Sequence, residues 1–133
     1  MQPIKIVISG TPEPWSAPLV TRRGFTVDKK APLKERIRWQ VRSQYTQEKI
    51  EEAVSLFFNF EVPVPKGSSK KKAQEMLSGK IKACKRPDVT NLQKLAEDCL
   101  IGIVIKDDNQ VVSISSKKTY SLDPKTTIIV ELA

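Results

Sequence analysis

The sequence contains no histidine and only two cysteines. The missing histidine excludes histidine-based nuclease chemistry, Ser-His-Asp hydrolysis and histidine-ligated zinc, so carboxylates, lysines and hydroxyls remain as catalytic groups. Cys84 and Cys99 are too few and too far apart for a zinc ribbon or a thioredoxin-like pair. We expect both thiols to be buried as small apolar side chains. Any bound metal is therefore expected to have oxygen ligands.

Long apolar runs and aromatic residues are also scarce. No segment approaches the roughly 18 consecutive apolar residues of a membrane span. The opening MQPIKIVISG is interrupted by Pro3 and Lys5, unlike a secretory signal, so we expect a protein of the cytoplasm with no membrane partner. Aromatic residues make up 6% of the chain, which argues against a single-strand binder that stacks bases on its surface.

What the sequence does contain is enough apolar residues for one core and a large excess of positive charge. At 133 residues with 39% apolar side chains, the chain is expected to form a single domain over residues 1–133. The formal charge of +8 favours a polyanionic partner. Residues 61–87 hold eight Lys and Arg against two Glu, whereas residues 88–133 hold five against seven acids. A basic surface beside an acidic pocket suits a metal-dependent enzyme acting on a phosphodiester, and an ordinary solvated lysine-rich surface is the alternative.

The hydrophobic pattern predicts strands and helices in alternation. Helical spacing over 30–52 and 88–100 indicates two amphipathic helices, and Gly102 is placed to end the second. A short basic helix is expected to begin at Ser68 or Ser69 and to end near Gly79. Strands are expected at 4–9, 53–62, 110–115 and 126–132. These elements predict an α+β fold, a mixed central β-sheet flanked by helices.

Acidic residues stand at the ends of these predicted elements. Asp88 begins the second long helix, and Asp107 and Asp108 precede the strand that follows it. The returning chain could bring the two regions together as a magnesium site, since Mg²⁺ often needs only one or two protein carboxylates plus substrate phosphate. The alternatives are a helix cap at Asp88 and a surface turn at Asp107–Asp108.

A polar stripe lies beside the apolar side of the same helix. Asn91, Lys94 and Asp98 project in nearly one direction at 100° per residue. Lys94 would then point toward the acidic site and could stabilise charge developing on a phosphate. Its alternative role is an ion pair with Asp98 one turn later.

The segment RPDVTNLQKLAEDCLIG followed by IKDDNQVV resembles the signature of the RusA-like endonucleases, small bacterial or phage nucleases. Members of that family show an acidic D-x-D-N-L-x-K block at a helix start and a D-D-x-Q block before a strand. The segments PWSAPLVTRRG and PKGSSKKK are similar to those in a branch of the family, so the resemblance spans most of the chain.

The resemblance implies a homodimer that resolves four-way (Holliday) junctions with Mg²⁺ or Mn²⁺ in DNA recombination and repair. By motif, Asp88 and Asp108 would be catalytic metal ligands and Lys94 a catalytic lysine. Asp107 would be a neighbouring acid at the metal, with Asn91 close to the ligands.

One position departs from the family pattern. Thr90 stands where the pattern has aspartate, and a neutral hydroxyl is a weaker ligand for a hard cation. Either Asp107 or Asp98 compensates and the protein is an active nuclease, which we expect, or it is a non-catalytic, structure-selective DNA-binding protein of the same fold.

Basic residues outside the motif are expected to contact DNA phosphates. They are Arg22, Arg23, Lys70, Lys71, Lys72, Lys85 and Arg86. A general RNA- or DNA-binding module is a further possibility, and it would not prefer a four-way junction over a duplex of equal length.

Overall fold

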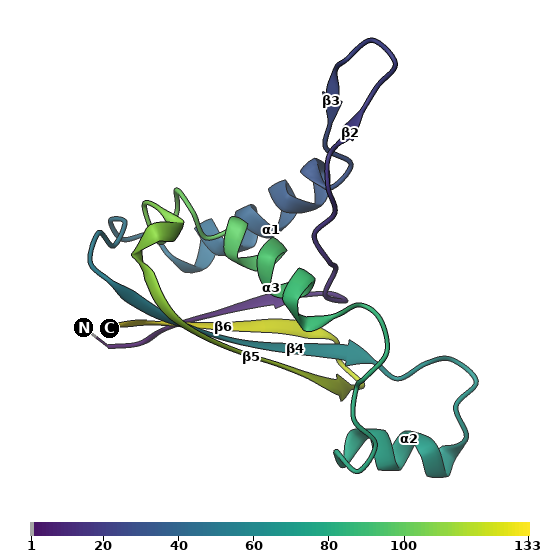
Figure 1. Ribbon diagram of the computed structural model, residues 1–133. Coiled ribbons are helices and arrows are strands. Elements are labelled where there is room, and N and C mark those ends of the chain that lie inside the picture. The colour runs from purple at the N-terminus through teal and green to yellow at the C-terminus, as the bar shows by residue number, and fades with distance from the viewer. Residues whose placement is uncertain (1) are drawn as a thin grey trace.

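The computed structural model describes residues 2–133 and contains one four-stranded sheet with helices over one face (Figure 1). The sheet has the order β1-β6-β4-β5, formed by β1 (Ile4–Ser9), β6 (Lys125–Leu132), β4 (Val54–Pro63) and β5 (Val111–Ser121). β6 pairs antiparallel with β1 and β4, whereas β5 runs parallel to β4. The mixed sheet of the predicted α+β fold is therefore confirmed.

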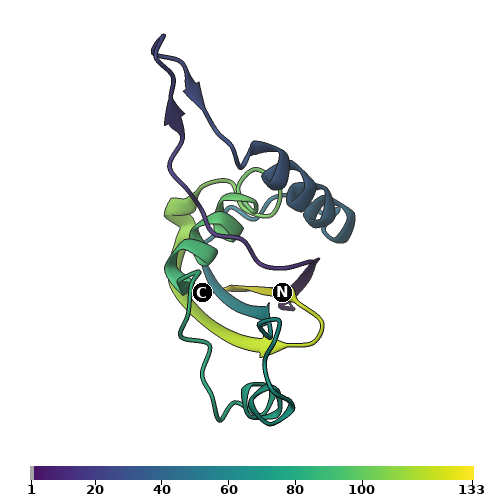
Figure 2. The ribbon, with the colours of Figure 1, turned by 90° about the vertical axis from the view of Figure 1, so that its right-hand side faces the viewer.

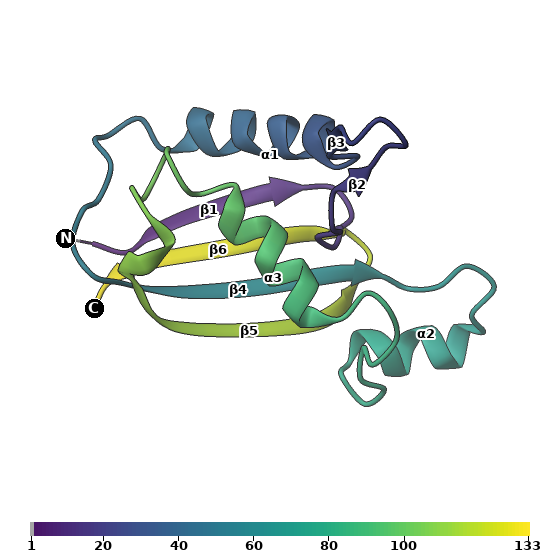
Figure 3. The same ribbon diagram turned by 45° about the horizontal axis from the view of Figure 1, so that its top comes forward.

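Helices α1 (Ala31–Gln44) and α3 (Val89–Asp98) cover one face of this sheet (Figure 3). Alternate residues of β4 face them, so that Leu56, Phe58 and Phe60 are buried. The apolar side of α3 packs onto these side chains through Leu92 and Ala96. Burial of one side of α3 therefore fixes which of its residues point away from the core.

Two excursions leave this body on opposite sides (Figure 2). A hairpin of β2 (Leu19–Val20) and β3 (Thr26–Val27) projects before α1, and the sequence did not predict it. The second excursion carries α2 (Lys70–Leu77), whose predicted cap is Ser69: its Oγ accepts the Lys72 N–H at 3.2 Å.

The boundaries of some elements differ from the prediction. The helix predicted over 30–52 ends at Gln44, because the Ile50 N–H is bound by the Val104 carbonyl at 2.8 Å instead of by a helical turn. The strand predicted over 110–115 continues to Ser121, since β5 pairs with β4 along its whole length. No helix within residues 2–133 is long and apolar enough to cross a membrane.

One expectation about the cysteines is wrong. Cys84 is exposed, because it lies in the loop between α2 and α3 rather than on an apolar face. Cys99 is buried at the end of α3 as expected, and burial raises the pKa of its thiol to about 11.

The side chain of Gln110 fixes the start of β5. Its Oε1 accepts the backbone N–H groups of Lys106 and Asp107 at 2.8 and 2.7 Å. Its Nε2 donates to the carbonyls of Ile50 and Glu52 at 2.6 and 3.0 Å. One carboxamide therefore joins the turn that carries Asp107 and Asp108 to the chain entering β4.

Replacing this carboxamide should destabilise the fold. Gln110→Ala leaves four backbone groups without their partner, which should lower the free energy of unfolding by about 2 kcal/mol. Urea denaturation followed by circular dichroism measures the change. Asn109→Ala is the control, since this exposed neighbour engages the turn through its backbone N–H. Equal stabilities for the two variants would contradict the role of Gln110.

Candidate active site

Asp88 stands at the start of α3 with its carboxylate free. It occupies the N-cap position, yet its side chain accepts no cap hydrogen bond; only its backbone carbonyl engages the helix, accepting the Leu92 N–H at 3.2 Å. The loop before it is held by Lys118, whose Nζ donates to the carbonyls of Lys85 and Pro87, each at 2.6 Å. The cap interpretation therefore holds for the position of Asp88 but leaves its carboxylate unused.

Basic side chains surround Asp88. A depression of the surface between the loop and the second half of β5 is lined by this aspartate together with Lys85, Arg86, Lys117 and Lys118. Two of the predicted DNA-binding residues, Lys85 and Arg86, are therefore neighbours of Asp88. Positive charge on the walls attracts phosphate.

Lys94 rests on an aromatic ring. Its Nζ lies 3.4 Å from the centroid of the Trp15 ring, and the Trp15 backbone N–H donates to the Asn91 carbonyl at 2.9 Å. Within residues 2–133 Lys94 forms no ion pair with Asp98, so the alternative role expected for it is not realised. Sequence reasoning missed Trp15, whose only signal was a large aromatic residue in a proline-rich loop.

Asp107 has a structural role at the start of β5. It caps a 3₁₀ turn, η1 (Asp108–Gln110): its Oδ1 accepts the Asn109 N–H at 3.0 Å, and Gln110 binds its backbone N–H in return. The hydrogen bond from Asn109 lowers the pKa of Asp107, while the contact with the Asp107 carboxyl raises the pKa of Asp108. The surface-turn interpretation thus describes Asp107, and Asp108 is the exposed acid beside it.

Glu97 is an acid that the sequence analysis did not identify. It lies half-buried in the last turn of α3, where burial raises the pKa of its carboxyl and the nearby charge of Asp108 raises it further. Gln93 lies one turn before Glu97 and accepts a hydrogen bond from Ser116 of β5 at 2.8 Å. At helical spacing Thr90, Gln93 and Glu97 share a side of α3, so that side faces the edge of the sheet formed by β5.

The two groups of acids lie at opposite ends of α3. Nine residues separate Asp88 from Glu97, which at 1.5 Å per residue is about 14 Å along the helix axis. Figure 1 shows β5 beginning beyond the far end of α3, and Asp108, directly before β5, is close enough to Glu97 for their charges to interact. The expectation that the returning chain brings Asp88 and Asp107–Asp108 together is therefore not met within one chain. Residues 2–133 contain no cluster of three or more side chains able to hold a metal ion.

These acids nevertheless lack neutralising partners. Among residues 2–133, no Lys or Arg forms an ion pair with Asp88, Glu97 or Asp108, although the chain carries a net charge of +8. Unpaired carboxylates are suitable ligands for a hard divalent cation. The chemistry of these residues therefore fits Mg²⁺ or Mn²⁺, provided that the acids at both ends of α3 contribute to one site.

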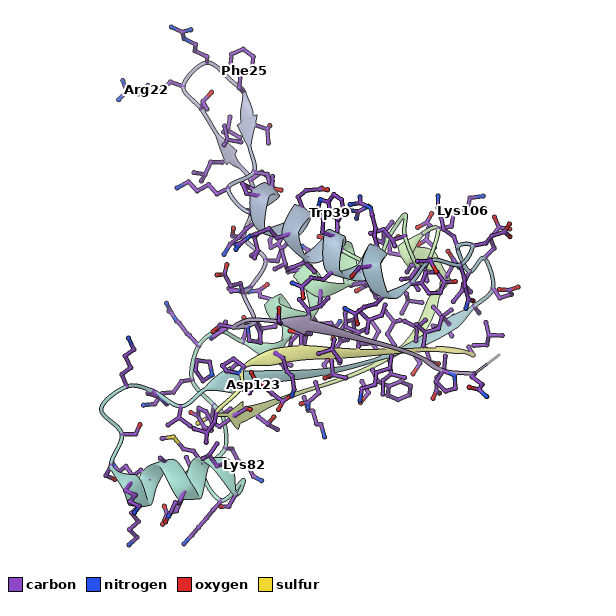
Figure 4. The ribbon with its side chains drawn as sticks, turned by 180° about the vertical axis from the view of Figure 1, so that it is seen from behind. Arg22, Phe25, Trp39, Lys82, Lys106 and Asp123 are labelled. Carbon is purple, nitrogen blue, oxygen red and sulfur yellow. The ribbon has the colours of Figure 1, made fainter. Side chains whose placement is uncertain are left out.

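The other predicted DNA-binding residues lie on the two excursions from the sheet. Arg22 and Arg23 are at the tip of the β2–β3 hairpin, and the lysines 70–72 begin α2 on the other excursion (Figures 2 and 4). The basic surface is thus divided among three places, of which only the loop with Lys85 and Arg86 adjoins an acid of the motif.

Comparison with known proteins agrees with this arrangement of motifs. The family model described as endodeoxyribonuclease RusA matches residues 10–131. A curated relative, the uncharacterised protein YqaN of Bacillus subtilis (strain 168), is 31% identical over 137 residues, covering 98% of this chain and 96% of YqaN. The match includes both acidic blocks and the connecting helix α3, and the chain belongs to the RusA endodeoxyribonuclease family.

Proposed function

We propose that this protein is a metal-dependent endodeoxyribonuclease that resolves Holliday junctions and related branched DNA in recombination and repair. The observation that carries the proposal is Asp88, an exposed carboxylate with no hydrogen bond from its helix, set among four cationic side chains. Such a site attracts a phosphodiester through its walls and a divalent cation through its acid. Membership of an endodeoxyribonuclease family supports the same reaction class.

We infer that a homodimer supplies the missing part of the site. The edge of the sheet at β1 is covered, because Gln44 binds both backbone groups of Val7 at 2.8 Å and Gln40 accepts the Ser9 N–H at 2.9 Å. β5 forms the other edge and pairs within residues 2–133 only with β4. It exposes Val112 by 64% and Ile114 by 38%, which is unusual for an edge that faces only water.

Antiparallel pairing of two β5 strands would bring the separated acids together. In such a pair the start of one strand lies beside the end of the other. Asp108 precedes the start of β5, whereas Asp88 adjoins Lys117 and Lys118 in its second half. A two-fold arrangement would therefore set Asp108 of one chain near Asp88 of the partner, twice over, as cutting two opposed strands requires.

We propose that Glu97 replaces the carboxylate that Thr90 lacks. Both residues are on the side of α3 that faces the β5 edge, and Glu97 stands close enough to Asp108 for their charges to interact. Asp107 is a weaker candidate because its carboxylate is already engaged by the Asn109 N–H. The ligands would then be Asp88 from one chain, with Asp108 and Glu97 from the other.

The remaining residues have distinct tasks in this scheme. Asp88, Asp108 and Glu97 would hold Mg²⁺ or Mn²⁺, which would supply Lewis acidity and a nucleophilic water. Lys94 would stabilise negative charge on the phosphate, and the Trp15 ring beneath its Nζ holds it in place before DNA binds. Lys85 and Arg86, with Lys70, Lys71 and Lys72, would bind the flanking phosphates.

A non-catalytic, structure-selective DNA-binding protein is the second candidate, and Thr90 is the observation that favours it. Loss of one carboxylate weakens cation binding without affecting the basic surfaces. Labelled four-way junctions incubated with Mg²⁺, with Mn²⁺ and without divalent metal distinguish the two functions. Symmetric cuts that require metal support the nuclease, whereas binding without any cut supports the DNA-binding protein.

Asp108→Asn should abolish cutting and preserve junction binding. The amide keeps the size of the side chain but loses the charge that attracts the cation. In the absence of metal, binding should strengthen slightly, since one fewer acid repels the phosphates. Cleavage and gel-shift assays on the same junction measure the two effects. Asp123→Asn is the control, because this aspartate is 87% exposed in its side chain and lies in the turn between β5 and β6 (Figure 4). Full cutting by Asp108→Asn would remove Asp108 from the site.

Thr90→Asp should raise the cutting rate at low Mg²⁺ and have a smaller effect at saturating Mg²⁺, because an added carboxylate mainly increases affinity for the cation. Glu97→Gln should have the opposite effect and shift the Mg²⁺ requirement upward. The double variant should cut more readily than Glu97→Gln alone. Metal titrations of the cleavage rate measure all three. If Glu97→Gln leaves the Mg²⁺ requirement unchanged, another residue compensates for the carboxylate that Thr90 lacks.

A further inference from the structure

The β2–β3 hairpin has an apolar tip whose side chains have no role in the proposed catalytic site. Phe25 is 67% exposed there, and Leu19, Val20 and Val27 behind it are exposed as well. Leu19 and Val27 are cross-strand partners, and alternation along the strand sets Phe25 on their side of the hairpin. A two-stranded hairpin of this size does not usually hold such a surface in water by itself.

The tip nevertheless has a defined hydrogen-bonded conformation. The Gly24 N–H donates to the Thr21 carbonyl at 2.9 Å, and the Thr21 N–H donates to the Phe25 carbonyl at 2.7 Å. The Thr21 Oγ1 accepts the Phe25 N–H at 3.1 Å, and Gly24 takes the left-handed conformation, with φ of 82°. These bonds form a three-residue hairpin loop in which a turn is followed by glycine. The loop sets Arg22 and Arg23 at the same end of the hairpin as Phe25, and Figure 4 shows Arg22 and Phe25 on opposite sides of the tip.

Both legs of the hairpin are anchored to the body of the protein, the outgoing leg at α3 and the returning leg at α1. The outgoing leg passes Trp15, which is bonded to Asn91 and lies under Lys94. The returning leg ends at Asp28, whose carboxylate accepts the Lys30 N–H at 2.9 Å and pairs with Lys34 at 3.1 Å. Figure 4 shows Arg22 and Phe25 at the far end of the hairpin, well away from the sheet. The hairpin is thus joined to the helical layer at both of its ends.

We propose that Phe25 is a wedge that enters the branch point of a DNA junction and stacks on an exposed base, while Arg22 and Arg23 bind the phosphates on either side. Apolar side chains inserted between bases are a common means of opening a base step, and flanking arginines satisfy the phosphates. Base faces at a branch point are already partly unstacked, so insertion costs less there than in a duplex. The tip carries two positive charges and no acid, which suits DNA and disfavours a basic partner protein.

A second copy of the chain is the rival occupant. Figure 3 shows the hairpin beyond α1, toward the β1 edge of the sheet, whereas β5 forms the opposite edge. In a dimer joined through β5, the two hairpins would therefore stand away from the interface. The wedge rests on the proposed function, since it requires branched DNA as the ligand.

The test uses the full chain and two four-way junctions, one with 2-aminopurine at the branch point and one with 2-aminopurine in the middle of an arm. In EDTA, so that no strand is cut, the wild-type protein should raise the fluorescence at the branch point only. Phe25→Ala should remove this rise and weaken junction affinity about tenfold, with affinity for an equal-length duplex unchanged. Phe25→Tyr should retain the signal. Trp39→Ala is the matched control, because Trp39 is an aromatic residue on α1 with the same exposure, 68%.

Three results would overturn the wedge. One is a branch-point signal in Phe25→Ala equal to that of the wild type. Another is that Phe25→Ala weakens duplex and junction affinity equally. The third is that Phe25→Ala forms a smaller particle than the wild type in light scattering, which would assign the hairpin to an interface between chains. If the wild type cuts junctions and any of these is observed, the nuclease function stands and the wedge fails. If the wild type shows no preference for a junction over a duplex, both fail.

Discussion

The packing of α3 across β4 and β5 is the constraint on which the candidate active site depends. Burial of Leu92 and Ala96 fixes the rotation of this helix, so that Thr90, Gln93 and Glu97 face the β5 edge. Its length then sets the distance between the acid at its start and the acids beyond its end. Because α3 has ten residues, the acids at its two ends stay apart within one chain, which is the basis of the proposed shared site. The free edge at β5 and the covered edge at β1 indicate how a second chain would join them.

Much of this architecture could be predicted from the sequence, because strong periodic patterns report burial directly. The α+β class, the strands with alternating apolar residues and the capped start of α2 at Ser69 all follow from local chemistry. The acidic blocks also identified the family, since their spacing is specific. The exposure of Cys84 was not predictable, because loop packing has no periodic signature.

Contacts between distant segments account for what the sequence could not reveal. The sequence around Lys94 does not predict its contact with Trp15, because Trp15 lies 79 residues earlier. The two side chains meet only when the N-terminal loop packs on α3. Nothing local marks Glu97 either, since only the fold brings it close enough to Asp108 for their charges to interact. The residues of the D-D-x-Q block have different roles that the motif alone does not reveal. Gln110 joins two segments of the chain, Asp107 caps the turn, and Asp108 makes neither of these contacts. The central claim that follows is an active site shared between two chains.

Mixed dimers test that claim most directly. Asp88→Asn and Asp108→Asn homodimers are prepared separately, then combined under conditions in which chains exchange, and assayed on a labelled four-way junction with Mg²⁺. If each site takes Asp88 from one chain and Asp108 from the other, a mixed dimer holds one site with both acids intact, and the mixture should regain nicking of one strand although neither parent cuts. If each site were built within one chain, every dimer would carry two damaged sites. A mixture that exchanges chains and still never cuts would therefore contradict the shared site.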